Sequence, residues 1–140
     1  MKRIFLLPAL FLMGNCLADE LHNFSEMKSA IVLGKSVRIV IDFSSCTTSA
    51  KTLTPIMTVA AFTPNEIGVT DDHIAASLTH LTMNNPAYKD QPVYEHARYT
   101  ITNNNDVILT HYAMDAATYK LKAEPVTFNC KIDSGVKIYD

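Results

Sequence analysis

The sequence predicts an α+β domain that is mainly antiparallel β, with an N-terminal helix packed on a sheet or a partly closed barrel and with one disulfide. Three observations support this fold class. The chain begins like an exported protein, which places its cysteines in an oxidising compartment. One segment with helical periodicity follows. The later apolar segments are short, and turn-forming residues separate them, as in a β-rich domain.

The N-terminal segment has the three parts of a secretory signal peptide. Two basic residues follow Met1, an apolar run covers residues 4–13, and Ala18 ends a small-residue cleavage site. The run is shorter than the roughly 20 apolar residues of a transmembrane helix. We expect residues 1–18 to be a cleaved signal and residues 19–140 to form one domain. The mature protein should be periplasmic or secreted, without a stable membrane anchor.

Lipidation of Cys16 is the alternative for this segment, because that cysteine also follows an apolar run. Asn15 disfavours it, since lipoprotein signals place Gly, Ala or Ser before the modified cysteine.

The cysteine count becomes even once the signal is removed. Of three cysteines, Cys16 leaves with the signal, and Cys46 and Cys130 remain. They permit one disulfide, which would close a loop of about 85 residues and contribute roughly 4.6 kcal/mol in the chain-entropy model. A reactive thiol or half of a metal site is the alternative, although neither cysteine belongs to a CxxC pair.

The charge balance is mildly acidic, with 12 Lys and Arg against 14 Asp and Glu in the full chain. The signal removes two of the basic residues. Such a balance does not favour nucleic acid or an anionic membrane as a partner. We expect a protein partner of unknown identity and no nucleic acid.

Residues 21–33 are the expected helix, because apolar side chains recur three and four positions apart. Asp19 or Asn23 is expected to cap its start, and Gly34 to end it. The polar face is not basic, which favours packing on a sheet over binding to a membrane.

Three strand-like segments follow. Residues 37–43 alternate apolar and polar side chains, which places one apolar row on one face of a strand. Residues 57–62 are rich in apolar and β-branched residues. Residues 74–81 also have strand character, although Ala75 and Ala76 leave a helix open.

The clearest hairpin joins residues 94–102 to residues 107–112 through a turn of asparagines and an aspartate. These residue types tolerate the positive φ of tight turns. Centring the turn on its middle two residues pairs Ile101 with Ile108 on the core face.

A second hairpin is expected from residues 126–132 and 136–139, joined by Asp133, Ser134 and Gly135. Its Cys130 would then cross-link the C-terminal element to the loop after the first long strand.

The proposed register places His96, Arg98 and His111 on one face, opposite the core. These residues could form an acid–base set with a phosphate-binding arginine, which is the basis of a small secreted hydrolase or nuclease as an alternative function. Glu95 does not join them, because neighbouring strand residues face opposite ways. No third metal ligand or HExxH spacing is visible, so we expect no metal, no cofactor and no catalytic residues.

Two further groups of residues could contribute to a function. The Ser- and Thr-rich residues 44–54 include Lys51, as a serine–lysine nucleophile would, but such clusters are mostly solvated loops. Five tyrosines could supply a binding surface, since tyrosine adds contact area at low entropy cost. They are Tyr88, Tyr94, Tyr99, Tyr112 and Tyr119.

Residues 34–46 (GKSVRIVIDFSSC), preceded by the short amphipathic helix, resemble the VirK family of small exported bacterial proteins. Residues 98–101, 128–132 and 135–136 are similar to the closing hairpins of that family. The resemblance covers most of the mature chain. It implies that the two mature cysteines are the family's pair and that the protein is associated with virulence. It implies no catalytic residues.

The function that these observations predict is a non-enzymatic, exported binding protein with a virulence-associated role. The runner-up is the secreted hydrolase or nuclease described above. A third interpretation is a secreted enzyme inhibitor, since small disulfide-linked β domains display rigid loops.

Overall fold

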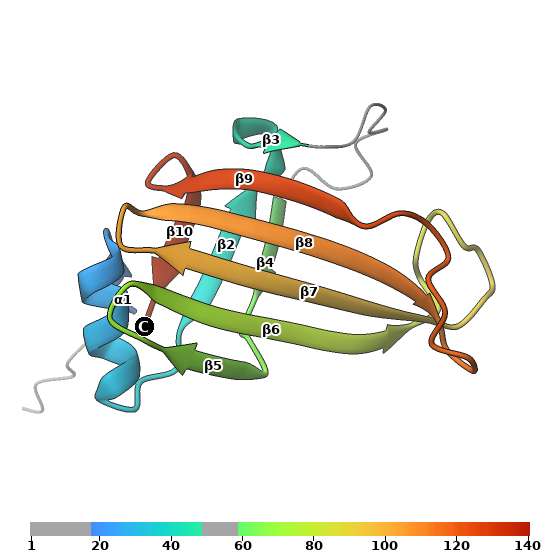
Figure 1. The fold of residues 1–140 in the computed structure, drawn as a ribbon, viewed down its shortest axis with the longest axis horizontal. Helices are drawn as coiled ribbons and strands as arrows, with labels where there is room; N and C mark the ends of the chain where they lie inside the picture. The colour runs from blue at the N-terminus through green and yellow to red at the C-terminus, as the bar shows by residue number, and fades with distance from the viewer. Residues whose placement is uncertain (1–17, 49–58) are drawn as a thin grey trace, which may run out of the picture.

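The computed structural model of the protein describes residues 18–48 and 59–140 (Figure 1). Residues 1–17 of the predicted signal peptide and residues 49–58 lie outside this part. The elements, in chain order, are β1 (Glu20–Leu21), α1 (Phe24–Val32), β2 (Arg38–Asp42), the 3-10 helix η1 (Phe43–Ser45), β3 (Thr47–Thr48), β4 (Val59–Phe62), β5 (Glu66–Val69), β6 (His73–Thr82), β7 (Val93–Thr102), β8 (Asp106–Asp115), β9 (Val126–Ile132) and β10 (Gly135–Tyr139).

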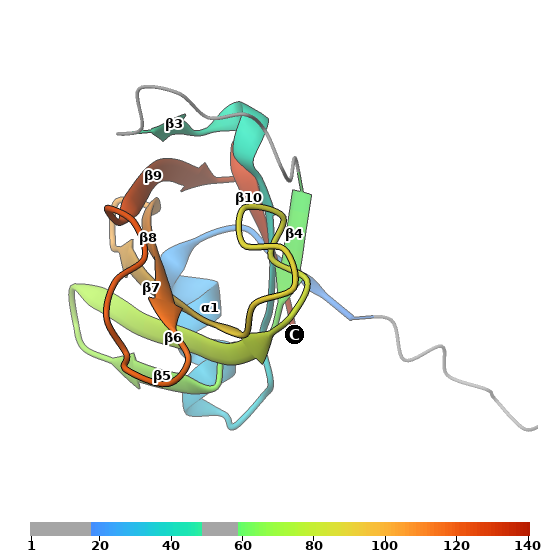
Figure 2. The ribbon, with the colours of Figure 1, turned by 90° about the vertical axis from the view of Figure 1, so that its right-hand side faces the viewer.

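The described strands form a single 10-stranded sheet. Its main path is β4-β2-β10-β9-β8-β7-β6-β5, with β1 beside β10 and β3 beside β9. All of these pairs are antiparallel except β9 with β10. Seen along the long strands, the sheet curls around the interior into a half-barrel (Figure 2). The predicted fold class, mainly antiparallel β with one N-terminal helix, is confirmed.

The predicted helix is present as α1, but it starts at Phe24. Asn23 has an extended backbone, and its side chain accepts a hydrogen bond from the Glu26 N–H at 3.0 Å. The Glu26 carboxylate accepts one from the N–H of His22, the residue before the cap, at 2.7 Å, so the two side chains together hold the start of the helix. Gly34, at φ +79, follows the last turn as predicted.

Helix α1 closes the end of the half-barrel where β5 turns into β6 and β7 into β8 (Figure 1). Its apolar face buries Phe24, Met27 and Ala30. Two polar contacts hold it there. The Phe24 N–H donates to Asn105 Oδ1 at 2.9 Å, and Lys28 Nζ lies 2.9 Å from Asp71 Oδ1.

Residues 74–81, for which the sequence left both a strand and a helix open, belong to strand β6. Ile74 and Ala76 face the core, whereas Ala75 is exposed, which is the two-residue period of a strand. β6 is paired with β5 on one side and with β7 on the other, and this pairing outweighs the helix propensity of the alanines.

The core lies between the curled sheet and α1. Each fully buried aliphatic side chain contributes about 1.5–3 kcal/mol relative to exposure. Phe62 of the edge strand β4 stacks on Tyr99 of β7, with ring centroids 4.4 Å apart, so the core reaches across the half-barrel. The largest fully buried side chains are Met27, Val37, Ile39, Ile41, Ile74, Val93, Ile101, Val107, Val136 and Ile138.

The register predicted for β7 and β8 is wrong by one residue. Ile101 pairs with Val107, not with Ile108. Asn105 has φ +66, and its N–H donates at 2.9 Å to the carbonyl three residues earlier, as in a three-residue loop that ends in a left-handed residue. A shift of one residue exchanges the two faces of a strand. Val107 and Leu109 are therefore buried, and Ile108 is exposed.

The predicted hairpin of β9 with β10 is also wrong, although both strands are present. β10 pairs antiparallel with β2 over four positions and lies parallel to β9 at only two. Asp133 and Gly135 have φ of +63 and +99, and they turn the chain sharply out of β9. β10 thus carries the C-terminus to the opposite wall of the half-barrel.

Cys46 and Cys130 form the predicted disulfide. It joins β9 to the segment after β2, as expected. Asp42 shapes that segment, because its Oδ1 accepts hydrogen bonds from the Ser44 N–H at 3.0 Å and the Ser44 hydroxyl at 2.6 Å. These bonds hold the pKa of the Asp42 carboxyl below its ordinary value.

Candidate binding face

The structure separates the residues of the predicted hydrolase or nuclease site. Because of the register shift, His111 pairs with Ala97 and shares the inner face with it, whereas His96 pairs with Tyr112 on the outer face. Arg98 is on the outer face with His96. The prediction that His96, Arg98 and His111 lie on one face is therefore wrong, and the acid–base set loses its geometry.

Glu95 and His96 face opposite sides of β7, as predicted. On the inner face, Glu95 Oε2 lies 3.0 Å from His80 Nε2, and its Oε1 accepts a hydrogen bond from Asn85 Nδ2 at 2.7 Å. On the outer face, His96 Nδ1 lies 2.7 Å from the Thr79 hydroxyl. The two side chains serve separate local networks.

The Ser- and Thr-rich segment shows no nucleophile arrangement in its described part. Ser44 and the neighbouring Ser45 hydroxyl interact with Asp42, a structural role at the start of η1. Lys51 lies outside the described residues, so the serine–lysine hypothesis remains a prediction.

The outer face of the sheet carries an apolar row at the end far from α1. Leu81 pairs with Tyr94, Tyr94 with Met114, and Met114 forms a bridge with Leu121. Four apolar or aromatic side chains thus follow one another across the sheet. Leu81 and Leu121 are 56% and 53% exposed. We call Leu81, Tyr94, Met114 and Leu121 the outer row.

Tyr119 extends the outer row from the β8–β9 loop. Its ring stacks on Tyr94 with centroids 5.3 Å apart, and it is 63% exposed. Asp115 builds the turn that presents it, because its Oδ1 accepts from the Thr118 hydroxyl at 2.8 Å and the Thr118 N–H at 2.9 Å. These bonds lower the pKa of Asp115, so the turn is held by a carboxylate over most of the pH range.

The electrostatics beside the outer row are asymmetric. Along β7, the outward side chains after Tyr94 are His96 and then Arg98. The ring centroids of His96 and Tyr112 are 5.7 Å apart, so these two side chains continue the aromatic surface. Arg98 is exposed and has no ion-pair partner within residues 18–48 and 59–140. An available guanidinium therefore lies next to an apolar and aromatic surface.

The other two predicted tyrosines have different roles. Tyr99 is in the core, where burial raises its pKa. Tyr88 lies under the ammonium group of Lys122, 4.9 Å from the ring centroid, in the loop between β6 and β7. The sequence does not distinguish the buried Tyr99 from the exposed Tyr119 and the half-buried Tyr88, Tyr94 and Tyr112, whereas the structure does.

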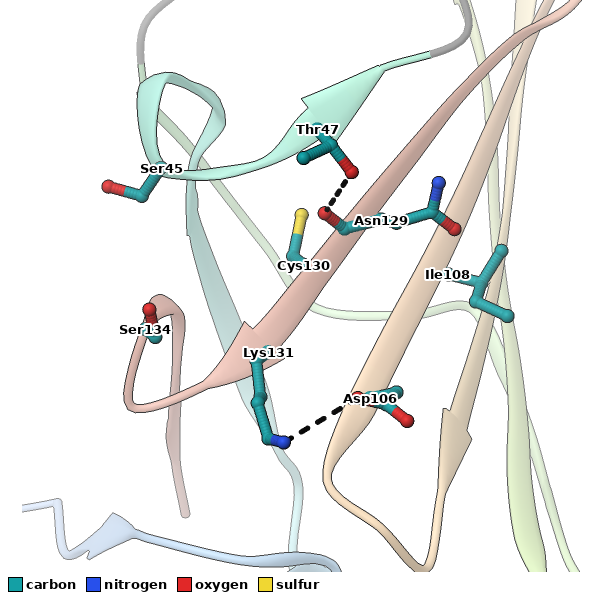
Figure 3. A pocket seen from close by; sticks show the side chains of 8 residues that line it. All are labelled: Ser45, Thr47, Asp106, Ile108, Asn129, Cys130, Lys131 and Ser134. Carbon is teal, nitrogen blue, oxygen red and sulfur yellow. Dashed lines mark hydrogen bonds and ion pairs between the residues drawn. The ribbon is translucent and has the colours of Figure 1, made fainter.

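A second surface feature is a shallow pocket of about 350 Å³ beside the disulfide (Figure 3). Strands β8 and β9, the segment around β3 and the β9–β10 turn supply its walls. Lys131 Nζ lies 3.8 Å from Asp106 Oδ1 on one side, and the Thr47 hydroxyl donates to the Asn129 carbonyl at 3.4 Å on the other. Ile108 is the one large apolar side chain among the residues that line this pocket, so we place the candidate binding face at the outer row.

A match to a protein-family model shows which family this chain belongs to. The model of the VirK protein family matches residues 20–119, which include α1 and the strands from β1 to β8. The chain belongs to the VirK family. The match ends before β9, so the similarity of residues 128–136 to the family's closing hairpins remains a prediction.

Two other proteins are similar to this VirK family member over most of its length. An uncharacterized protein in the pinF2 3′ region of Rhizobium radiobacter is 27% identical over 123 residues, which cover 85% of this chain and 83% of that protein. A VirK family protein from Legionella pneumophila has a crystal structure with a TM-score of 0.78 at 24% identity, covering 86% of this chain and 98% of that one. The second similarity supports the fold.

Among the described residues of this VirK family member, no helix is long and apolar enough to cross a membrane.

Proposed function

We propose that this VirK family member is an exported, non-enzymatic binding protein that recognises a protein partner through the outer row and Tyr119. The role associated with virulence is part of this proposal and follows from the family resemblance. The observation that carries the proposal is the unbroken run of Leu81, Tyr94, Met114 and Leu121 across the outer face.

Exposed apolar side chains that adjoin one another distinguish a binding surface from an ordinary one. Single exposed apolar residues are common, whereas contiguous patches mark interaction sites. Tyr94 and Tyr119 are stacked, so their ring orientations are fixed before binding and little rotamer entropy remains to be lost. A preorganised aromatic pair is a suitable centre for a binding hot spot.

Arg98 indicates the chemistry of the partner. It is exposed near the aromatic surface and has no ion-pair partner within the described residues. A protein segment with apolar anchors for the outer row and a carboxylate opposite Arg98 would complement this face. A secreted enzyme inhibitor is the special case in which that partner is an enzyme.

Affinity capture with matched variants tests the proposal. The bait is the oxidised protein, and the test variant is L81S/L121S, which removes the two most exposed aliphatic members of the outer row. The control is V32S/L33S, because Val32 and Leu33 at the end of α1 are 72% and 76% exposed and lie far from the row.

A protein retained by the wild type and by V32S/L33S, but lost by L81S/L121S and weakened by Arg98→Ala, supports the proposed face. Retention by L81S/L121S at wild-type level would assign binding to another surface. The circular dichroism spectrum of each variant serves as the check that the fold is intact.

A further inference from the structure

Three side chains of types that bind metal ions lie close together beside β1, just before α1. Glu20 belongs to β1, His22 lies just before the helix cap, and Asp133 lies in the β9–β10 turn. One ligand atom from each lies within 4.8 Å of the other two. His22 and Asp133 are 111 positions apart in sequence, so no spacing motif could have predicted this group.

The geometry within the group fits a small transition-metal ion. His22 Nδ1 lies 3.3 Å from Asp133 Oδ1. In a tetrahedral zinc site with bonds of about 2.0–2.1 Å, two ligand atoms are separated by about 3.3–3.4 Å. The imidazole and the carboxylate, which form a hydrogen bond in the absence of an ion, are thus already at the spacing of two ligands. The ligand atom of Glu20 lies within 4.8 Å of both.

The backbone holds two of these side chains in place. The His22 N–H donates to Glu26 Oε2 at 2.7 Å, and the Asp133 N–H donates to the Val136 carbonyl at 2.9 Å. Glu20 is fixed through β1, where it pairs with Tyr139 of β10. The donors therefore come from backbone positions that the fold sets, and not from one mobile loop.

The donor types favour a cation of intermediate softness. Glu20 and Asp133 supply two carboxylates and His22 one imidazole, and the ion would share the Glu20 carboxylate with Lys137, whose Nζ is 3.0 Å from Glu20 Oε1. Imidazole suits zinc and similar ions, whereas calcium and magnesium prefer oxygen ligands alone. Three protein ligands leave a position for water.

We propose that Glu20, His22 and Asp133 form a binding site for a divalent transition-metal ion, of which Zn²⁺ is the type. Binding there ties the N-terminal segment to the β9–β10 turn and so stabilises the folded state by mass action. This inference concerns a region separate from the outer row, and it does not depend on the proposed function.

Isothermal titration with Zn²⁺ tests the site, using the oxidised protein that begins at Asp19, which lacks the unpaired thiol of Cys16, prepared without a polyhistidine tag and stripped with a chelator. The wild type should bind one equivalent. His22→Ala, Glu20→Gln and Asp133→Asn should each weaken binding at least tenfold. Asparagine keeps the tolerance for the left-handed backbone at position 133, so the last variant is expected to fold.

The matched control is His73→Ala. His73 Nδ1 lies 2.8 Å from Asp72 Oδ1, so it is also in an exposed histidine–aspartate pair, but it belongs to no group of three ligands within the described residues. Its Zn²⁺ affinity should equal that of the wild type, and a given Zn²⁺ concentration should raise the melting temperature of both proteins by more than that of Asp133→Asn. Absence of Zn²⁺ binding by the wild type, or an equal loss in His73→Ala and His22→Ala, would overturn the assignment.

Discussion

Gly135 lies where the chain leaves β9 and passes beside the disulfide. Its φ of +99 is rarely adopted by residues with a side chain, and a Cβ built there would lie 3.2 Å from Ser45 Cβ and 3.4 Å from Cys46 Sγ. Gly135→Ala should lower the free energy of unfolding by about 1–3 kcal/mol, measured by urea denaturation of the oxidised protein.

The control for this change is Gly68→Ala in β5. A Cβ there would meet nothing within 4 Å. Gly68→Ala should change the free energy of unfolding by no more than about 0.5 kcal/mol, as ordinary surface substitutions do. Similar losses in the two variants would show that backbone conformation and close packing are not what position 135 requires.

His111 couples stability to pH. Burial on the inner face lowers its pKa below the ordinary value of 6.5, His80 adds to this effect, and Glu95 opposes it. Well above pH 6.5 the ring is neutral in both states. As the pH falls below 6.5, the unfolded chain binds the proton first, so the free energy of unfolding decreases until the folded state is protonated too.

Denaturant midpoints recorded between pH 7.5 and pH 5 check this sign. His111→Gln should lose less stability than the wild type over that interval, because it has no ring to protonate. An identical pH dependence for the two proteins would show that His111 contributes nothing to it.

The turn between β7 and β8 shows what element-level patterns can and cannot predict. Alternating apolar residues located both strands, and the asparagines located the turn. The pattern did not determine the loop length, because Asn104 and Asn105 both tolerate positive φ. Only Asn105 adopts it, and its side chain also accepts the hydrogen bond from the Phe24 N–H. Contact with α1, distant in sequence, selects the register.

Asn105→Ala should therefore destabilise the protein by about 1–3 kcal/mol, because alanine disfavours the left-handed backbone and leaves the Phe24 N–H without its acceptor. Asn104→Ala is the matched control, since Asn104 is exposed and has no left-handed φ. Chemical denaturation of both variants makes the comparison. Loss in the Asn104 variant alone would contradict the turn described here.

The helix, β2 and the long strands could be predicted because each has its own periodicity over five or more residues. The two-residue strands β1 and β3 are too short to give a pattern. The partner of β10 could not be predicted either, since periodicity identifies a strand but not the strand beside it. For the same reason, the outer row became visible only when β6, β7, β8 and Leu121 were placed in register.

At the scale of the whole molecule, one covalent bond links the two walls of the half-barrel. The Cys46–Cys130 disulfide spans 84 positions, and constraining so long a loop in the unfolded chain contributes about 4–5 kcal/mol in the chain-entropy model. The double variant C46S/C130S should lose up to that amount in urea denaturation, while wild type under reducing conditions should approach the same stability.

The disulfide is expected to form because the protein is expected to be exported to an oxidising compartment. Thiol titration and mass spectrometry together check both expectations. The exported protein should show no free thiol when unfolded without reductant, and its mass should begin at Asp19. Two titratable thiols or a lipid-modified Cys16 would contradict the proposed processing.

The outer row is the proposed protein-binding face. The most direct measurement places a photo-crosslinking amino acid at position 121, in the row, or at position 32, on α1, in bacteria that produce the protein. If the outer row binds a protein, position 121 should give a discrete protein adduct that is absent from position 32. The same adducts from both positions, or an adduct from position 32 alone, would contradict it.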